Sequence, residues 1–241
     1  LKFLPILSFW IPQLIITVSK NSKKIYKDKG YDFKKLKFIP NGYDLSILKI
    51  NNSERIKFKK KNKLQNHISV IGNVARYDPQ KDHFNLLKAL SLIRSKNLNF
   101  VCILVGYNMN KNNVELTSEI KKLKLSNYVK LLGQSNKISQ VMNGIDIHVL
   151  SSSYGEGFPN VVAEAMSCGT PCIVTDVGDS AFVVGKNGWI VPPRNVIKLT
   201  EAIEKALKEK NTKKWNKRCN RARLRIKEKF SISKMITLYN N

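Results

Sequence analysis

The residues with the clearest chemical potential lie in a short loop and in the first turns of the helix predicted after it. Pro159 suits the first turn of a helix, where its missing N–H group is not needed. The free N–H groups of the next residues and the helix dipole favour an anion, so backbone amides could hold a diphosphate there. Gly155 and Gly157 let the backbone approach such a ligand closely.

Two acidic residues flank this helix start. Glu156 lies in the loop just before the helix, and Glu164 lies more than one turn inside it. A carboxylate accepts pairs of hydrogen bonds from hydroxyl groups, so each acid suits a sugar ring, and the whole arrangement suits a sugar nucleotide. The pattern leaves a second interpretation open, in which the helix start merely favours acids and Glu164 is a surface residue.

Alternating strands and helices are predicted around this loop. Apolar runs predict buried strands at residues 68–72, 100–105, 128–132, 145–150, 171–175 and 188–191. One-sided apolar spacing predicts helices at residues 83–94, 113–124, 136–143, 159–167 and 196–208. This order indicates an α/β fold with a Rossmann-like parallel sheet and helices on both faces. Ligands bind such sheets outside the carboxyl ends of the strands, where the helix at 159–167 begins.

The composition excludes several classes of protein. Of the 241 residues 42% are apolar, which excludes an intrinsically disordered chain, and four cysteines are too few for a disulfide scaffold. We interpret Cys102, Cys168 and Cys172 as small apolar side chains in a reducing compartment. The 43 Lys and Arg residues against 17 acids give a net charge of +26, which attracts polyanions. The three histidines show no metal-ligand spacing, so we predict no metal.

The segments outside the alternating pattern carry weaker signals. We predict a short buried helix at residues 6–10, and a buried strand at 14–18 that has no partner within the chain. Residues 44–66 are polar and charged, and are predicted to form a linker and lead-in. Asp176 and Asp179 follow a strand and could either line a cleft or serve the turn.

Residues 156–171, EGFPNVVAEAMSCGTP, resemble the signature of the retaining GT4 glycosyltransferases, in which seven residues separate two glutamates. Further matches occur in the same order along the chain, at residues 18–19, 39–44, 72–76 with Lys81, 104–106, 132–133 and 187–192. The resemblance begins near residue 14 and covers almost all of the chain after it. It implies the GT-B fold, which has two Rossmann-like domains and an active site between them.

The resemblance also implies roles for single residues. Arg76 and Lys81 would neutralise the donor diphosphate and stabilise the leaving nucleoside diphosphate, and Glu156 would contact the transferred sugar. Glu164 would bind the ribose hydroxyls. Other substrate-binding positions would cradle the phosphates or border the nucleobase: Gly157, Phe158, Pro159, Asn160 and Val161 for the phosphates, and Gly133 and Gln134 for the base. The donor would be a nucleotide sugar, with no metal or other cofactor.

The family pattern predicts four segments. Residues 1–43 resemble the end of an N-terminal domain and the crossover, 44–66 the linker, 67–210 the nucleotide-sugar-binding domain, and 211–241 the C-terminal helices. Most of the N-terminal domain, which carries the acceptor site in such enzymes, has no counterpart in the chain. We therefore expect the chain to bind the donor at best, and to transfer sugar to a glycan or lipid-linked acceptor poorly or not at all by itself.

Location and other functions are predicted from the remaining features. The basic stretch 213–229 could lie on an anionic membrane surface or pack back on the sheet. We expect a cytoplasmic enzyme of cell-surface polysaccharide synthesis, peripheral at the inner face of the membrane. The spacing of Glu156 and Glu164 disfavours a GT-B epimerase or phosphorylase. A nucleic-acid-binding protein fits the charge, but the chain lacks the motifs of one, so no specific nucleic acid is expected.

Overall fold

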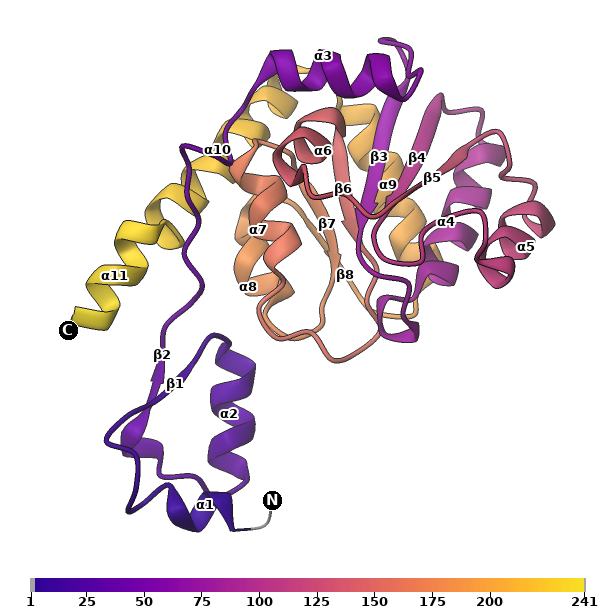
Figure 1. Ribbon diagram of the computed structural model, residues 1–241. Coiled ribbons are helices and arrows are strands. Elements are labelled where there is room, and N and C mark those ends of the chain that lie inside the picture. The colour runs from indigo at the N-terminus through magenta and orange to yellow at the C-terminus, as the bar shows by residue number, and fades with distance from the viewer. Residues whose placement is uncertain (1–2, 241) are drawn as a thin grey trace.

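A computed structural model describes residues 3–240 and contains a six-stranded parallel sheet (Figure 1). The strand order is β5-β4-β3-β6-β7-β8. The strands are β3 (Ser69–Val74), β4 (Phe100–Val105), β5 (Val129–Gly133), β6 (Ile147–Leu150), β7 (Cys172–Thr175) and β8 (Trp189–Val191). The predicted α/β fold with a parallel sheet is confirmed.

Helices cover both faces of this sheet, as predicted. One face is covered by α4 (His83–Ser95), α5 (Val114–Lys122) and α9 (Val196–Glu209). The other is covered by α3 (Asn52–Lys61), α6 (Ile138–Gly144), α7 (Asn160–Ser167), α8 (Ser180–Val184) and α10 (Lys213–Lys229). Successive strand residues point into opposite cores: Val70 joins the core under α7, and Ile71 joins the core under α4.

Element boundaries agree with the sequence where local signals are strong. Strand β4 covers the predicted residues 100–105. Helix α7 begins at Asn160, one residue later than predicted, because Pro159 takes the position that caps the helix. Residues 3–240 also contain three short 3₁₀ helices: η1 (Phe33–Lys35), η2 (Pro79–Lys81) and η3 (Gly185–Asn187).

A small N-terminal unit precedes the main domain. It consists of α1 (Leu4–Leu7), β1 (Ile15–Thr17), α2 (Lys20–Asp28) and β2 (Leu36–Phe38). The prediction that the first strand lacks a partner is wrong, because β1 and β2 pair in parallel. Strand β2 is only three residues long and has Lys37 at its centre, so the sequence contains no apolar run that would predict this strand.

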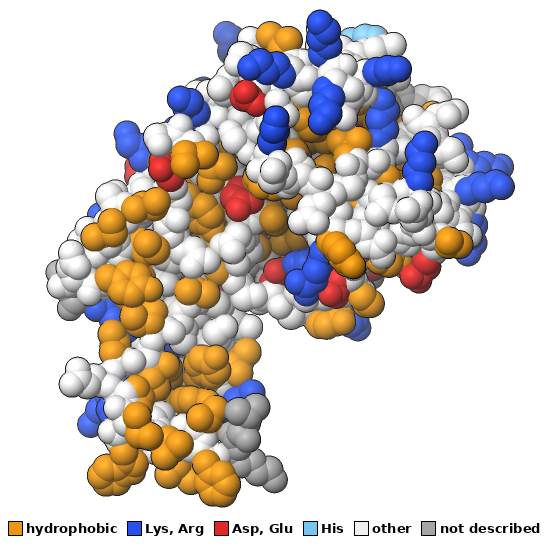
Figure 2. Space-filling view, viewed as in Figure 1, with side chains coloured by type: hydrophobic (Ala, Val, Ile, Leu, Met, Phe, Trp, Pro, Cys, Tyr) orange, Lys and Arg blue, Asp and Glu red, His pale blue; other side chains and the backbone are white. Residues whose placement is uncertain are grey.

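The predicted buried helix at residues 6–10 is also corrected. The helix α1 spans Leu4–Leu7, and none of its residues is buried. Trp10, which follows it, is 82% exposed. Figure 2 shows apolar side chains gathered over this N-terminal unit. They stay exposed because no element among residues 3–240 packs over that side of the unit.

The predicted polar linker at 44–66 contains the helix α3. Asn51 caps its start by accepting hydrogen bonds from the amides of Ser53 and Glu54. Phe58 is buried against Gly144 at the end of α6, where a Cβ atom would lie 2.0 Å from the phenyl ring. One buried aromatic residue among many lysines is too little periodicity to predict a helix, yet it anchors α3 to the domain.

The basic C-terminal stretch packs back on the domain, as one of the two predicted alternatives states. Helix α10 buries Trp215 and Ile226, and lies against α7. Arg225 donates hydrogen bonds to the backbone carbonyls of Phe182 and Val183 in α8. The last helix, α11 (Ile232–Asn240), buries no residue.

The strand order determines where a ligand can bind at the carboxyl end of the sheet. Strand β3 pairs with β4 on one side and with β6 on the other, so the chain progresses outward in both directions from this pair. The loops that leave the carboxyl ends of β3 and β6 therefore lead to helices on opposite faces of the sheet, α4 and α7. Folds of this kind bind ligands at the sheet end between two such loops, and we call this place the crevice. These loops are residues 75–82 and 151–159.

Candidate functional site

The two loops at the crevice are bonded to each other. The amide of Ser153 donates to the carbonyl of Gln80 at 2.8 Å, and the side chain of Gln80 donates to the carbonyl of Gly155 at 2.9 Å. The hydroxyl of Ser151 donates to the carbonyl of Lys81 at 2.9 Å. The loop after β3 thus holds the loop after β6 in one conformation.

An ion pair at the centre of the crevice joins two predicted site residues. The Nζ atom of Lys81 lies 2.5 Å from Oε1 of Glu156. Only 15% of the Lys81 side chain and 7% of the Glu156 side chain are exposed to solvent. A charge-assisted hydrogen bond this well shielded from water holds both side chains in place. The structure therefore brings the predicted cation and the predicted sugar-binding acid together.

The start of α7 has the free amides that the sequence predicts. No side chain within residues 3–240 caps the helix. Among the described residues 3–240, no acceptor bonds the amides of Gly157, Phe158, Asn160 or Val161. These amides, in the loop and at the first turn, lie at the positive end of the helix dipole, where an anion is stabilised.

Contacts with the crossover segment at residues 39–44 fix the same helix start. Oδ1 of Asn160 accepts hydrogen bonds from Nδ2 of Asn41 at 2.8 Å and from the hydroxyl of Tyr43 at 2.6 Å. The ring of Phe158 stacks on Tyr43 and meets Phe230 edge to face. Oδ1 of Asn160 and the ring of Phe158 point into these contacts, and the backbone amides of both residues remain for a ligand.

Glu164 lies on α7 in a half-buried position. Burial raises the pKa of its carboxyl group, because water is a better solvent for the charge than the protein interior. No hydrogen bond to this carboxyl group comes from the part of the chain that the structure describes. The negative charge of Glu164 adds to burial in raising the pKa of the neighbouring Tyr43 hydroxyl. Glu164 therefore has acceptor capacity to spare.

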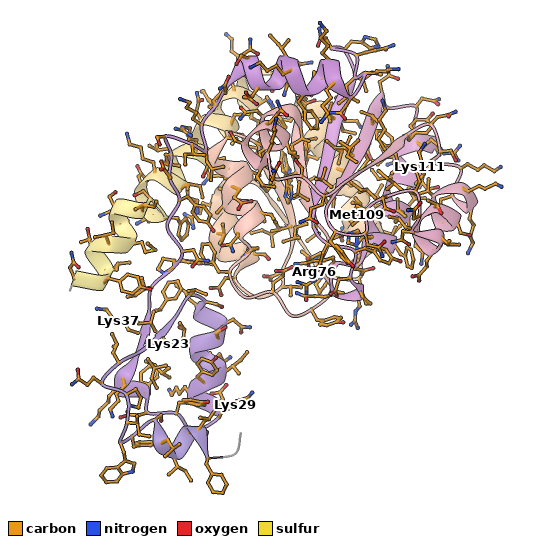
Figure 3. The ribbon with its side chains drawn as sticks, in the orientation of Figure 1. Lys23, Lys29, Lys37, Arg76, Met109 and Lys111 are labelled. Carbon is orange, nitrogen blue, oxygen red and sulfur yellow. The ribbon has the colours of Figure 1, made fainter. Side chains whose placement is uncertain are left out.

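Arg76 lies after β3 but outside the ion pair. Its side chain is 59% exposed, and Nε donates to Oδ2 of Asp78 in the same loop at 3.0 Å. Figure 3 shows Arg76 at the loop edge of the main domain. The exposed guanidinium group thus lies beside the crevice with one acidic partner, Asp78, which a diphosphate could replace at little cost.

The predicted base-binding loop lies on the other side of the crevice, after β5. Gly133 adopts a left-handed conformation with φ of 68°, and its amide donates to the carbonyl of Met109 at 2.8 Å. Gln134 lines a cavity of about 230 Å³, which Val105 and Leu132 also border. No bond among the described residues connects this loop directly to Glu156 or Lys81.

Sequence reasoning missed the role of Asp179. Its buried carboxylate accepts hydrogen bonds from the amides of Lys20, at 2.6 Å, and Asn21, at 3.1 Å. These are the first two amides of α2, so Asp179 links the N-terminal unit to the main domain. Its own amide donates to the carbonyl of Gly157 at 3.0 Å. A turn aspartate gives no sequence signal for a partner more than 150 residues away.

A neighbouring glycine shows how tightly this turn meets the site. Gly178 has φ of 57°, and a Cβ atom there would lie 1.8 Å from the carbonyl oxygen of Glu156. A side chain at position 178 would therefore displace the loop that carries Glu156.

Comparison with known proteins identifies the family. Residues 54–225 match the family described as "Glycosyl transferases group 1". The chain belongs to this family. The match covers the sheet, both crevice loops and most of α10.

Curated relatives of this glycosyltransferase chain are longer than it is. It is 28% identical over 152 residues to "Putative glycosyltransferase EpsF" of Bacillus subtilis. This alignment covers 63% of this chain and 39% of EpsF. It is 29% identical over 249 residues to an Escherichia coli UDP-Gal:alpha-D-GlcNAc-diphosphoundecaprenol alpha-1,3-galactosyltransferase, covering 98% of this chain and 61% of that enzyme. The chain thus spans about two to three fifths of the length of these relatives.

Solved structures show the same architecture. Anabaena Alr3699/HepE in complex with UDP-glucose is 26% identical with a TM-score of 0.87, covering 98% of this chain and 65% of HepE. A glycosyltransferase from Rickettsia africae shares the fold, with 23% identity and a TM-score of 0.86, over 95% of this chain and 62% of its own length.

Metal-binding clusters and membrane-spanning helices are both absent from residues 3–240. No three His, Cys, Asp or Glu side chains in this range are grouped so that they could hold a metal ion. None of the helices in this range combines the length and the apolar character that a bilayer crossing requires.

We predict that Asp179→Ala loosens the contact between α2 and the main domain. The amides of Lys20 and Asn21 should exchange with deuterium roughly tenfold faster, because a hydrogen bond to a charged acceptor contributes about 1.5–3 kcal/mol. Asp176→Ala is the control, since Asp176 is exposed in the same loop. Equal exchange in wild type and Asp179→Ala would show that the contact does not hold the two parts together.

Proposed function

We propose that this chain binds the nucleotide-diphosphate sugar donor of a retaining GT4 glycosyltransferase. The observation that carries the proposal is the crevice between β3 and β6, where Lys81 and Glu156 meet beside the uncapped start of α7. Cation, carboxylate and free amides in one crevice complement the charged and hydroxyl groups of such a donor.

The diphosphate occupies the start of α7 in this proposal. The amides of Gly157, Phe158, Asn160 and Val161 donate to its oxygens, and Arg76 and Lys81 balance its charge. As the bond between sugar and diphosphate breaks, negative charge accumulates on the leaving nucleoside diphosphate. The free amides at the start of α7 are fixed by the helix and stabilise this charge with little reorganisation, and Arg76 and Lys81 add positive charge nearby. The chain itself supplies this stabilisation, so the proposal includes no metal or other cofactor.

The two glutamates bind the two sugars of the donor. Glu164 accepts hydrogen bonds from the ribose hydroxyls; the absence of a hydrogen-bond partner among residues 3–240 and its half-buried position support this role. Glu156 accepts from hydroxyls of the transferred sugar. The nucleobase lies against Gly133 and Gln134, where the cavity after β5 offers apolar walls and an amide side chain.

The acceptor is a growing glycan, or one linked to a lipid, in bacterial cell-surface polysaccharide synthesis. The names of two relatives support this choice: the E. coli galactosyltransferase acts on a diphosphoundecaprenol-linked sugar, and CapM of Staphylococcus aureus is a capsular polysaccharide biosynthesis glycosyltransferase. An acceptor of this kind places the enzyme at the cytoplasmic face of the membrane, as a peripheral protein. The +26 net charge favours attachment to anionic lipids.

We predict that Glu164→Ala weakens binding of UDP or GDP to the chain by roughly ten- to a hundredfold in calorimetry, because hydrogen bonds between the ribose hydroxyls and a charged acceptor are lost. Glu201→Ala is the control, since Glu201 is an exposed glutamate on α9. Wild type that binds neither nucleotide would reject the donor proposal. Equal affinity of wild type and Glu164→Ala would reject the ribose assignment alone.

Binding of UDP-glucose should depend on pH through Glu164. Its folded-state pKa is raised by burial, so the carboxylate gains a proton at a higher pH than an ordinary glutamate does. As pH falls through that value, affinity should fall by up to about tenfold per pH unit. The donor itself has no terminal phosphate that titrates near pH 6. Glu164→Gln should bind more weakly at pH 8 and lose this dependence; an unchanged pH profile would contradict the assignment.

A further inference from the structure

Ser152 contacts the predicted sugar-binding acid but is absent from the set of site residues that the sequence predicts. Its hydroxyl donates a hydrogen bond to Oε1 of Glu156, the oxygen that Lys81 also contacts. No hydrogen bond from residues 3–240 reaches Oε2. The two oxygens of one carboxylate therefore differ: Oε1 has two donors, and Oε2 is available.

The position of Ser152 is itself fixed. Ser152 is fully buried two residues after the end of β6, and the hydroxyl of Thr175 at the end of β7 donates to its carbonyl at 2.6 Å. The carbonyl oxygen of Glu156 packs closely against Gly178, which limits the movement of the Glu156 backbone. Ser152 thus acts from rigid strand ends on a side chain whose backbone is also fixed.

A second donor on Oε1 determines the orientation of the carboxylate group. The terminal torsion of a glutamate side chain has a broad, roughly two-fold preference, so a single lysine contact leaves the group free to turn. Two donors that converge on Oε1 from different elements restrict this rotation. The lone pairs of Oε2 are then held in one direction before a ligand arrives, which lowers the entropic cost of binding.

We propose that Ser152 is a positioning residue that presents Oε2 of Glu156 to the hydroxyls of the transferred sugar. This inference rests on the proposed donor function. It makes a specific claim about recognition: Ser152 affects the sugar part of the donor and not the nucleoside diphosphate, which the amides of α7 and Glu164 bind.

The test compares donors that carry a sugar with the same nucleotides without one. Calorimetry on the 241-residue chain would use UDP-glucose and GDP-mannose, with UDP and GDP as the sugar-free references. Ser152→Ala should lower the affinity for the sugar nucleotide that wild type binds by roughly tenfold. The affinity for the matching nucleoside diphosphate should change by less than about twofold.

Ser167→Ala is the matched control. Ser167 is also fully buried, and its hydroxyl donates to a backbone carbonyl inside α7 at 2.8 Å, away from the crevice. This variant removes the same atom from a similar environment, and should change neither affinity.

Three outcomes would count against the inference in different ways. If folded Ser152→Ala binds the sugar nucleotide as tightly as wild type does, Ser152 does not position Glu156. If it loses affinity for both ligands equally, Ser152 supports the whole loop and not the sugar site. If wild type binds none of the four ligands, the proposed donor function fails, and the role of Ser152 fails with it.

Discussion

The bond between Lys81 and Glu156 closes the loop after β3 onto the loop after β6, and the candidate site depends on this closure. It fixes how far the cationic loop lies from the amides at the start of α7. The sheet provides the conditions for the bond, because the strand order reverses between β3 and β6 and places these loops on either side of a crevice. The topology of the sheet thus brings together the two charged side chains that form the centre of the candidate site.

The central fold could be predicted because its signals are local. Strand β4 is an apolar run that is buried on both faces, and its boundaries at Phe100 and Val105 follow from the sequence. The start of α7 was predictable because proline suits the first residues of a helix. The spacing of Lys81 and Glu156 along the chain does not predict that they pair. Each follows a strand end within a family-like motif, however, and this position marks both as candidates for the site.

Features that depend on distant partners could not be predicted. Asp179 accepts hydrogen bonds from α2, and nothing near Asp179 in the sequence specifies that contact. Phe58 anchors α3 only because Gly144 leaves room for its ring. Serine is common in loops, so the presence of Ser152 in this loop does not indicate a function. Its contact with Glu156 forms only once the loop is folded. In each case the role of a side chain depends on a contact that forms only in the tertiary structure, and a local sequence pattern does not predict such a contact.

The central claim is that the start of α7, between Lys81 and Glu164, holds the diphosphate of a nucleotide sugar. A crystal structure of the chain with bound UDP tests it most directly. We expect phosphate oxygens within hydrogen-bond distance of the amides of Asn160 and Val161, and the ribose hydroxyls bonded to Glu164. A nucleotide bound elsewhere, for instance along the basic helix α10, with the start of α7 free of phosphate, would contradict it.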